Sequence, residues 1–294
     1  MIKFLKDISN ANEVVLGMNR RNVEYIRKYN SRRDYPLADN KIFSKIFFKE
    51  HGLPAPVNIK TYSNLYELNN LKKDLSLVND FVVKPASGSQ GNGIIVVVEN
   101  KQDHVVTISG KILSLDNLKY ECASILFGKY SQGNQDEVIV EERIITCEEL
   151  KKSSEGGLPD IRIIVIDEVP YLAMLRLPTL ESKGKANLHQ GGIGVGIDIL
   201  TGHSNFAHLH GNKIIKHPRL DLDLSKIQIP YWQEILDITK KLSKKSPLKY
   251  IGVDMTIDEH KGPMILEFNA RPGLEIQNAN QVGMLSLFKQ IETS

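Results

Sequence analysis

The chain has 294 residues, and 38 Lys and Arg residues against 35 Asp and Glu residues give it a formal net charge of +3. Hydrophobic residues make up 41% and charged residues 25%, which excludes a collagenous, low-complexity or disordered chain. The small positive excess gives no argument for nucleic acid or membrane lipid as a partner. Cys122 and Cys147 lack metal-ligand spacing and are expected to be packed thiols.

Residues 1–17 resemble neither a signal peptide nor a membrane span, because Lys3, Lys6, Asp7 and Glu13 interrupt their apolar residues. No other segment of the sequence has the required apolar length. We therefore expect a cytoplasmic protein that does not insert into a membrane.

In chain order, the first clear pattern is helical. Apolar residues within 42–47 recur at helical spacing, with Asp39 placed to cap the helix and Gly52 to stop it. Two apolar runs, 81–83 and 94–98, then predict short strands.

The second half of the chain predicts strand pairs separated by helices. The predicted segments are a strand at 138–140, a hairpin of 161–166 and 171–177 turning near Asp167 and Glu168, a helix at 231–245, a hairpin of 253–257 and 264–268, and a closing helix at 278–291. Adjacent strand pairs of this kind are typical of the α+β class.

A stretch rich in small residues, 86–93, joins the first two predicted strands and follows Lys84 and Pro85. Glycines allow backbone N–H groups to approach phosphate oxygens, the hydroxyls of Ser87 and Ser89 add donors, and the lysine adds charge. The order differs from a P-loop because the lysine precedes the glycines. The alternative is a Gly/Ser hairpin turn with an incidental lysine.

The last predicted hairpin carries Asp254 on one strand and Glu267 and Asn269 on the other. Glu267 and Asn269 are two residues apart and share a face, and Asp254 can lie opposite them. Carboxylate and amide oxygens suit Mg²⁺. The alternative is two solvated acids and a turn asparagine, but these residues interrupt apolar strands, where an inward acid needs a partner.

Basic residues form a third candidate group: Lys41, Arg162, Arg176 and Arg271. Guanidinium groups bind phosphate or carboxylate through two parallel hydrogen bonds. An exposed surface arginine is the ordinary alternative, and Arg176 is the exception because its neighbours are apolar.

Taken in order, these motifs resemble the ATP-grasp fold, and more closely its alpha-L-glutamate ligase-like, sugar-transfer-associated branch. The resemblance covers about residues 17–283. The strings that carry it are GMNRRN at 17–22, YNSRR at 29–33, PLADNK at 36–41, ANLHQGG at 186–192 and LEFNARPGL at 266–274.

The resemblance implies an α+β fold in which two subdomains hold the nucleotide between them. It implies a basic helical segment at 1–35, an N-terminal ATP-grasp subdomain at 36–140 and a C-terminal subdomain with the Mg²⁺ site at 141–294. A full preceding substrate domain is absent from this pattern, so a partner protein is a possible source of it.

The resemblance also implies functional residues. ATP is expected to contact Lys41, Lys84, Ser87, Gly88, Ser89, Gln90, Gly91, Glu141, Glu142 and Ile144, with either Glu148 or Glu149 on the ribose. Mg²⁺, as two ions with Mn²⁺ as a substitute, is expected on Asp254, Glu267 and Asn269, with Glu267 bridging. The γ-phosphate and substrate pocket is expected to contain Arg162, Arg176 and Arg271, with Asn187 and His189 facing the same cleft.

The implied activity is ATP-dependent formation of an amide from a carboxylate and an amine, both small molecules or peptides, through an acyl phosphate. Glutamate or another amino acid is the expected added group. Two alternatives stay open: a kinase that phosphorylates a hydroxyl, and a non-catalytic ATP-binding module.

Overall fold

The computed structural model describes residues 14–88, 91–101 and 103–292. The chain divides into two compact units, each built on one antiparallel sheet. Unit 1 is formed by Met1–Ala38, His51–Pro54 and Thr146–Ser294, and unit 2 by Asp39–Glu50 and Ala55–Ile145. Within the described ranges, every helix is too short or too polar to cross a membrane.

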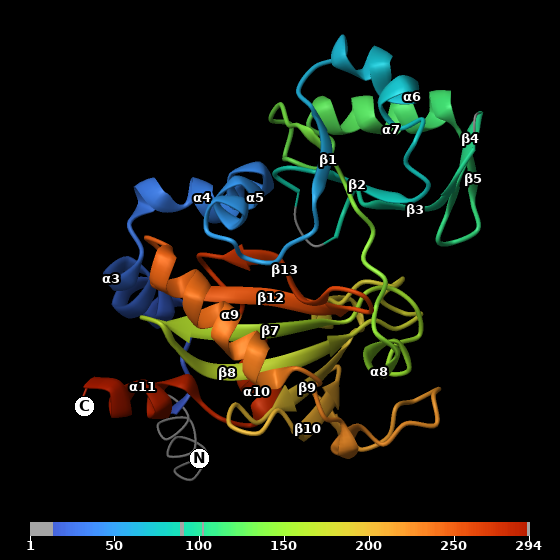
Figure 1. Cartoon of the computed structure of the whole chain (residues 1–294). Helices are drawn as coiled ribbons and strands as arrows, with labels where there is room; N and C mark the ends of the chain where they lie inside the picture. The colour runs from blue at the N-terminus through green and yellow to red at the C-terminus, as the bar shows by residue number, and fades with distance from the viewer. Residues whose placement is uncertain (1–13, 89–90, 102, 293–294) are drawn as a thin grey trace. The chain divides into compact units, whose positions relative to one another are not determined.

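Unit 2 contains a six-stranded sheet in the order β1-β6-β2-β3-β4-β5 (Figure 1). Its strands are β1 (Asn58–Tyr62), β2 (Phe81–Pro85), β3 (Ile95–Asn100), β4 (His104–Thr107), β5 (Ile112–Ser114) and β6 (Val138–Glu141). Its α-helices are α5 (Lys41–Glu50), α6 (Leu71–Asp74) and α7 (Leu115–Leu126). The two strands predicted at 81–83 and 94–98 are confirmed as β2 and β3, which are antiparallel neighbours.

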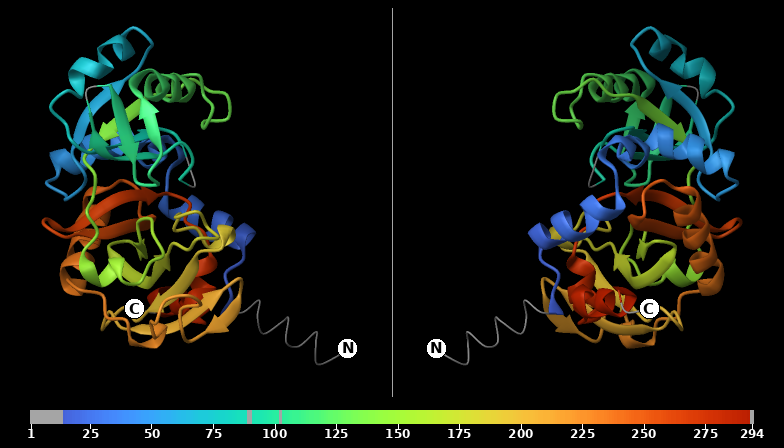
Figure 2. Two further views of the ribbon diagram at one scale, coloured as in Figure 1. Left: turned by 90° about the vertical axis from the view of Figure 1, so that its right-hand side faces the viewer. Right: turned by 90° about the vertical axis from the view of Figure 1, so that its left-hand side faces the viewer.

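One face of this sheet forms the apolar core of unit 2. Phe81 and Val83 of β2 point into it and pack with Leu118 and Ile125 of α7. The helix runs along this face of the sheet (Figure 2). Because side chains alternate along a strand, Lys84 points to the opposite face.

Helix α5 begins after a cap that the sequence analysis placed one residue too early. The side-chain oxygen of Asn40, not of Asp39, accepts the amide of Ile42 at 2.8 Å. Asp39 instead ends the short helix α4 (Pro36–Asp39). Gly52, with φ of 56°, follows the helix in the left-handed conformation that glycine adopts readily.

Unit 1 contains a seven-stranded sheet in the order β11-β10-β9-β8-β7-β12-β13. Its strands are β7 (Asp160–Ile166), β8 (Val169–Leu177), β9 (Ile193–Ile197), β10 (Ser204–Leu209), β11 (Asn212–Ile214), β12 (Tyr250–Asp258) and β13 (Gly262–Asn269). Its α-helices are α2 (Met18–Arg20), α3 (Arg27–Tyr29), α8 (Glu148–Lys151), α9 (Trp232–Lys245), α10 (Glu275–Asn280) and α11 (Met284–Glu292).

Both predicted hairpins of unit 1 are confirmed. Strands β7 and β8 turn at Asp167 and Glu168, whose φ values of 45° and 72° suit a tight two-residue turn. Strands β12 and β13 pair with each other, and β12 also pairs with β7. The second hairpin is thereby attached directly to the first.

The even-numbered residues of β7 change character along the strand. Ile164 and Ile166 lie in an apolar cluster with Tyr250 and with residues of α10 and α11. Asp160 and Arg162 continue the same face beyond that cluster. The charged end of this face is the candidate site.

The single closing helix predicted at 278–291 is wrong, because the structure has two helices, α10 and α11. Gln281 breaks the segment with φ of 53°. Gly283 packs so closely that a Cβ there would lie 2.1 Å from the carbonyl oxygen of Val14. Gly283 therefore allows close approach of the N-terminal segment just after the break, a contact that the local sequence does not reveal.

The basic N-terminal segment predicted at 1–35 overlaps described residues only from residue 14 onward. From there residues 18–29 are helical, as expected: α2 and α3 flank a six-residue π-helical stretch, Arg21–Ile26. Tyr25 and Ile26 are buried in the same cluster as Ile164. This part of the segment therefore contributes to the core of unit 1.

Candidate active site

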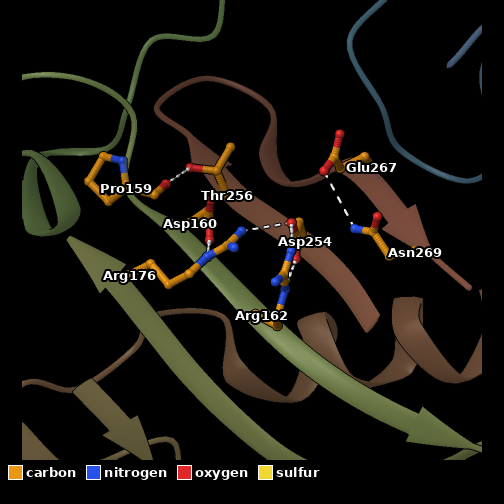
Figure 3. Close-up of polar contacts among 8 residues, drawn as sticks. All are labelled: Pro159, Asp160, Arg162, Arg176, Asp254, Thr256, Glu267 and Asn269. Atoms are coloured by element: carbon orange, nitrogen blue, oxygen red, sulfur yellow. Dashed lines mark hydrogen bonds and ion pairs between the residues drawn. The ribbon is translucent and has the colours of Figure 1, made fainter. Parts of the chain in front are cut away.

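The candidate site in unit 1 is built by the register of its sheet. Asp254 on β12 lies directly opposite Glu267 on β13 and also opposite Arg162 on β7. On the next row, Asp160 of β7 lies opposite Arg176 of β8. Directly opposed residues share a face, so the five charged side chains gather on one surface of the sheet (Figure 3).

Arg162 holds Asp254 through two hydrogen bonds. Its Nε donates to Oδ1 at 2.7 Å, and its Nη2 donates to Oδ2 at 2.5 Å. This is the two-point geometry of a guanidinium and a carboxylate, which fixes orientation as well as supplying attraction. The carboxylate that receives these bonds is buried, because Asp254 is only 2% exposed.

Arg176 connects two buried carboxylates. Its Nε donates to Oδ1 of Asp160 at 2.5 Å, and its Nη2 donates to Oδ2 of Asp254 at 2.7 Å. Arg176 is 9% exposed. With Arg162, these residues form a charge cluster in which two acids balance two guanidinium groups.

The two acids of the cluster differ in protonation. Burial raises the pKa of Asp160 to about 7; Arg176 opposes this shift and Asp254 reinforces it. Burial also acts to raise the pKa of Asp254, but Arg162 and Arg176 together hold it below its ordinary value. Asp254 is therefore ionised at neutral pH, whereas Asp160 titrates close to neutral pH.

Glu267 and Asn269 lie at the edge of this cluster on β13. Both side chains are partly exposed, and Asn269 Nδ2 lies 3.5 Å from Glu267 Oε1. No group of three His, Cys, Asp or Glu side chains able to hold a metal occurs in the described part of the chain. The predicted magnesium set contains only two carboxylates, and its third member is an amide.

The other predicted residues of unit 1 lie in different surroundings. Arg271 is exposed and stacks its guanidinium 4.6 Å from the ring centroid of Tyr35. His189 is exposed on a 3₁₀ turn, and its amide is capped by the side chain of Asn187 at 3.0 Å. Their assignment to the substrate pocket stays a prediction.

Unit 2 gathers lysines around one buried carboxylate. Lys84 Nζ lies 2.5 Å from Glu141 Oε1, and Lys45 forms an ion pair with Oε2 of the same residue. Lys41, one helical turn before Lys45, donates its Nζ to the carbonyl of Gly88 at 2.5 Å. Three lysines from α5 and β2 therefore approach the start of the small-residue loop and the end of β6.

Glu141 is 5% exposed, yet it is held in the charged form. Burial acts to raise its pKa, but Lys84 and Lys45 outweigh this effect and lower it. Burial in turn lowers the pKa of Lys45, against the attraction of Glu141. Two lysines against one acid leave a net positive charge, which suits an anionic ligand.

The loop after β2 is anchored at both described ends. The amide of Ser87 donates to Oδ1 of the buried Asp136 at 3.0 Å. Gly88 packs against Pro85, and Gly93, with φ of 77°, packs against the ring of Tyr130. The predicted contacts of Ser89 and Gln90 lie outside the described residues, and those of Gly91 stay a prediction.

The segment predicted to read adenine and ribose follows β6. The amide of Glu142 donates to the carbonyl of Val57 at 3.0 Å, and the predicted adenine contact of Glu142 stays a prediction. Ile144 is half-buried. Glu148 and Glu149 are both exposed on α8, and Glu148 forms ion pairs with Lys151 of the same helix and with Lys152, which follows it. The ribose assignment between them stays open.

Sequence reasoning missed three residues that organise these sites: Asp160, Lys45 and Asp136. Asp160 stands two residues before Arg162 in a strand, a spacing that already placed both on one face. Lys45 follows Lys41 by four residues in a predicted helix, which was an equally readable signal. Asp136 carried no local signal, because its partner Ser87 is far away in the sequence.

Two antiparallel α+β units, one with a lysine-flanked small-residue loop and one with an Asp–Glu–Asn set on a hairpin, define an ATP-grasp fold. The chain belongs to the sugar-transfer-associated ATP-grasp family, whose sequence model matches residues 20–293. This result confirms the fold and the resemblance inferred from the sequence motifs.

Solved structures of ATP-grasp ligases are similar in fold. The D-Ala:D-Ser ligase VanG from Enterococcus faecalis is 13% identical, with a TM-score of 0.50, over 87% of this chain and 61% of that chain. The ATP-grasp ligase PsnB, complexed with a minimal precursor, is 16% identical, with a TM-score of 0.47, over 90% and 62%. A D-alanine–D-alanine ligase from Bacillus anthracis, complexed with ATP, is 17% identical, with a TM-score of 0.46, over 87% and 65%.

This chain thus spans less than two thirds of the length of each of these three ligases. The comparison with curated proteins finds no match.

Proposed function

We propose that the protein is an ATP- and Mg²⁺-dependent ligase that joins a carboxylate to an amine through an acyl phosphate. The observation that carries the proposal is the pairing of Asp254 with Glu267 across β12 and β13, beside Arg162, in a member of an ATP-grasp family. Catalysis of this kind depends on positioning and electrostatics, and it needs no side-chain nucleophile.

The donor set fits Mg²⁺. Asp254 accepts one N–H on Oδ1 and two on Oδ2 among the described contacts, so Oδ1 retains one acceptor position. Glu267 and the carbonyl of Asn269 add further hard oxygen donors from the neighbouring strand. When bound there, Mg²⁺ would neutralise negative charge on the phosphates of ATP.

The cluster around Asp254 has a positioning role in this proposal. Arg176 is buried between Asp160 and Asp254, so we assign it to orienting Asp254 rather than to contacting phosphate. Arg162, which is less buried, orients the same carboxylate. Arg271 is the exposed guanidinium of the group, and we propose it together with His189 as a substrate contact.

The lysine cluster of unit 2 is proposed to bind the phosphates of ATP. Lys84 and Lys41 supply the charge, and Glu141 holds Lys84 and Lys45 in place. The described residues Ser87, Gly88 and Gly91 belong to the loop proposed to cover the phosphates. Glu142 and Ile144 are assigned to adenine, and Glu148 or Glu149 to ribose.

The proposed reaction has two displacements. A carboxylate oxygen of the first substrate bonds to the γ-phosphorus while the bond to the leaving ADP oxygen breaks. The amine nitrogen of the second substrate then bonds to the acyl carbon, phosphate leaves, and the nitrogen loses a proton. Glutamate or another amino acid as the amine, and a peptide or small molecule as the carboxylate, are the proposed substrate classes.

The test is ATP consumption against a panel of carboxylate and amine pairs, with ADP, free phosphate and product mass followed together. The proposal predicts equal amounts of ADP, phosphate and a new amide. Glu267→Gln should abolish the signal, whereas Glu259→Gln, which changes an exposed turn acid, should leave it intact. ADP without free phosphate, together with a phosphorylated product, would establish a kinase instead.

A further inference from the structure

His208 on β10 is a buried imidazole that the proposed reaction has not yet used. It is 4% exposed, and neither of its ring nitrogens has a hydrogen-bond partner among the residues that the structure describes. Buried polar groups in native proteins almost always have partners, so an imidazole without one calls for an explanation.

The sheet register places His208 in line with the charge cluster. One row crosses four strands. Asp160 of β7 lies opposite Arg176 of β8, which lies opposite Gly194 of β9. Gly194 in turn lies opposite His208 of β10. Neighbouring strands are about 4.8 Å apart, so roughly 10 Å separate the backbones of Arg176 and His208. The residue between them is a glycine and puts no side chain in the way.

The imidazole of His208 lies over Gly194. A Cβ built on this glycine would be 2.6 Å from Nε2 of His208 and 2.7 Å from Cδ2 of Leu188. The ring therefore covers Gly194, on the face of the sheet that carries Arg176, and Leu188 packs on the same spot.

The cover over this position is a short turn. Leu188 begins the 3₁₀ turn Leu188–Gln190, which Asn187 caps. Gly184 and Gly191 flank this turn with φ values of 74° and 93°. A turn bounded by such residues is the kind of segment that absorbs backbone rotation when a site opens.

We propose that His208 binds the amine substrate of the ligation, accepting a hydrogen bond from its N–H when the turn carrying Leu188 moves off the ring. The inference rests on the proposed function and names the residue that recognises its second substrate.

The charges around His208 favour a donor over an anion. Burial lowers the pKa of His208, against the attraction of Glu275 on α10, so the imidazole is neutral at neutral pH and offers a lone pair. Glu275 adds negative potential, whereas Arg162 and Arg176 are already hydrogen-bonded to Asp254 and Asp160. The amino group of an amino acid suits these surroundings, and a carboxylate group placed against the ring does not.

The first experiment measures binding without turnover. The ring ¹⁵N resonances of the full chain are recorded while each of the twenty common amino acids is added, and the His208 signals are identified by their loss in His208→Gln. We expect at least one amino acid to shift them with saturation. The inference is overturned if none of the twenty shifts them.

The second experiment uses variants. Because the ring nitrogens have no partner, His208→Leu should keep or raise the melting temperature, since it removes an unsatisfied buried group. It should raise the KM for the amine by about tenfold or more and leave the KM for ATP unchanged. His208→Gln should recover part of the loss, and His203→Gln, at an exposed position, should have no effect.

The two experiments separate this inference from the proposed function. A shifted His208 signal in a protein that forms no amide would support the binding site and contradict the ligase. Amide formation with an unchanged amine KM in His208→Leu would support the ligase and overturn the role of His208.

Discussion

Arg162 and Asp254 lie opposite each other on β7 and β12 and are joined by two parallel hydrogen bonds. The same carboxylate also accepts a hydrogen bond from Arg176. Asp254 is therefore both a proposed magnesium ligand and the centre of a buried charge cluster. Its neighbour Glu267, on β13, is partly exposed. Because the two acids differ in burial, variants of each should have different effects on stability even where both abolish activity.

We predict that Asp254→Asn and Glu267→Gln both abolish ATP turnover but differ in stability. Asp254→Asn removes the carboxylate that Arg162 and the buried Arg176 share, and we expect it to lower the free energy of unfolding by about 3–5 kcal/mol. Glu267→Gln should change it by less than about 1 kcal/mol. Urea unfolding of both variants measures this contrast, and equal stabilities would contradict the described cluster.

The pKa of Asp160 predicts a pH dependence of stability. An unfolded aspartate has a pKa of about 3.9, and burial raises that of Asp160 to about 7. The folded chain therefore binds this proton more tightly, so the stabilisation is complete below pH ~4 and is lost as the pH rises through 7.

The measurement is the difference in unfolding free energy between the wild type and Asp160→Asn. We expect this difference to fall between pH 5 and pH 7, by at most about 1.4 kcal/mol per pH unit. A difference that stays constant over this range would mean that Asp160 is already ionised at pH 5.

Because Lys45 and Lys84 both pair with Glu141, we predict that the stability losses of their variants are not additive. Lys84→Met should lower ATP turnover about 100-fold or more, with little loss of stability, because Lys45 still balances Glu141. The double variant Lys45→Met/Lys84→Met should lose about 3–5 kcal/mol, since it leaves a buried carboxylate without a cation.

Adding Glu141→Gln to that double variant is the control, and it should restore most of the lost stability because the uncompensated charge is gone. Thermal unfolding of the single, double and triple variants tests this sequence. Additive losses without recovery in the triple variant would contradict the role given to Glu141.

Gly93 tests how the small-residue loop after β2, which we propose binds phosphate, is built. Its φ of 77° and its contact with Tyr130 both oppose a side chain. Gly110 has a φ of 78° but nothing within 4 Å of a built Cβ, so Gly110→Ala reports backbone strain alone. We expect Gly93→Ala to destabilise the protein by about 1 kcal/mol or more beyond Gly110→Ala. Equal losses, measured by urea unfolding, would show that Tyr130 yields without cost.

The parts of the site that depend on alternation along a single hairpin could be predicted from the sequence. Glu267 and Asn269 share a face because they are two residues apart, and the short turn between β12 and β13 brings Asp254 opposite. The tight turn at Asp167 and Glu168 could also be predicted, because it depends only on neighbouring residues.

Other features depend on sheet order and on distant contacts. Arg176 of β8 can reach Asp254 of β12 because the sheet order separates these strands by β7 alone. Gly283, just before α11, approaches Val14 so closely that a Cβ would not fit. Helix α7 was missed although Ser114 caps it by accepting the amide of Asn117, which is a readable local signal.

The most direct test of the central claim follows an oxygen atom. The ligation is run with a carboxylate substrate labelled with ¹⁸O in both oxygens, and the released phosphate is analysed by mass spectrometry. An acyl phosphate transfers one carboxylate oxygen to phosphorus, so we expect one ¹⁸O in each phosphate released, together with the amide. Unlabelled phosphate, or a labelled phosphorylated product without any amide, would contradict it.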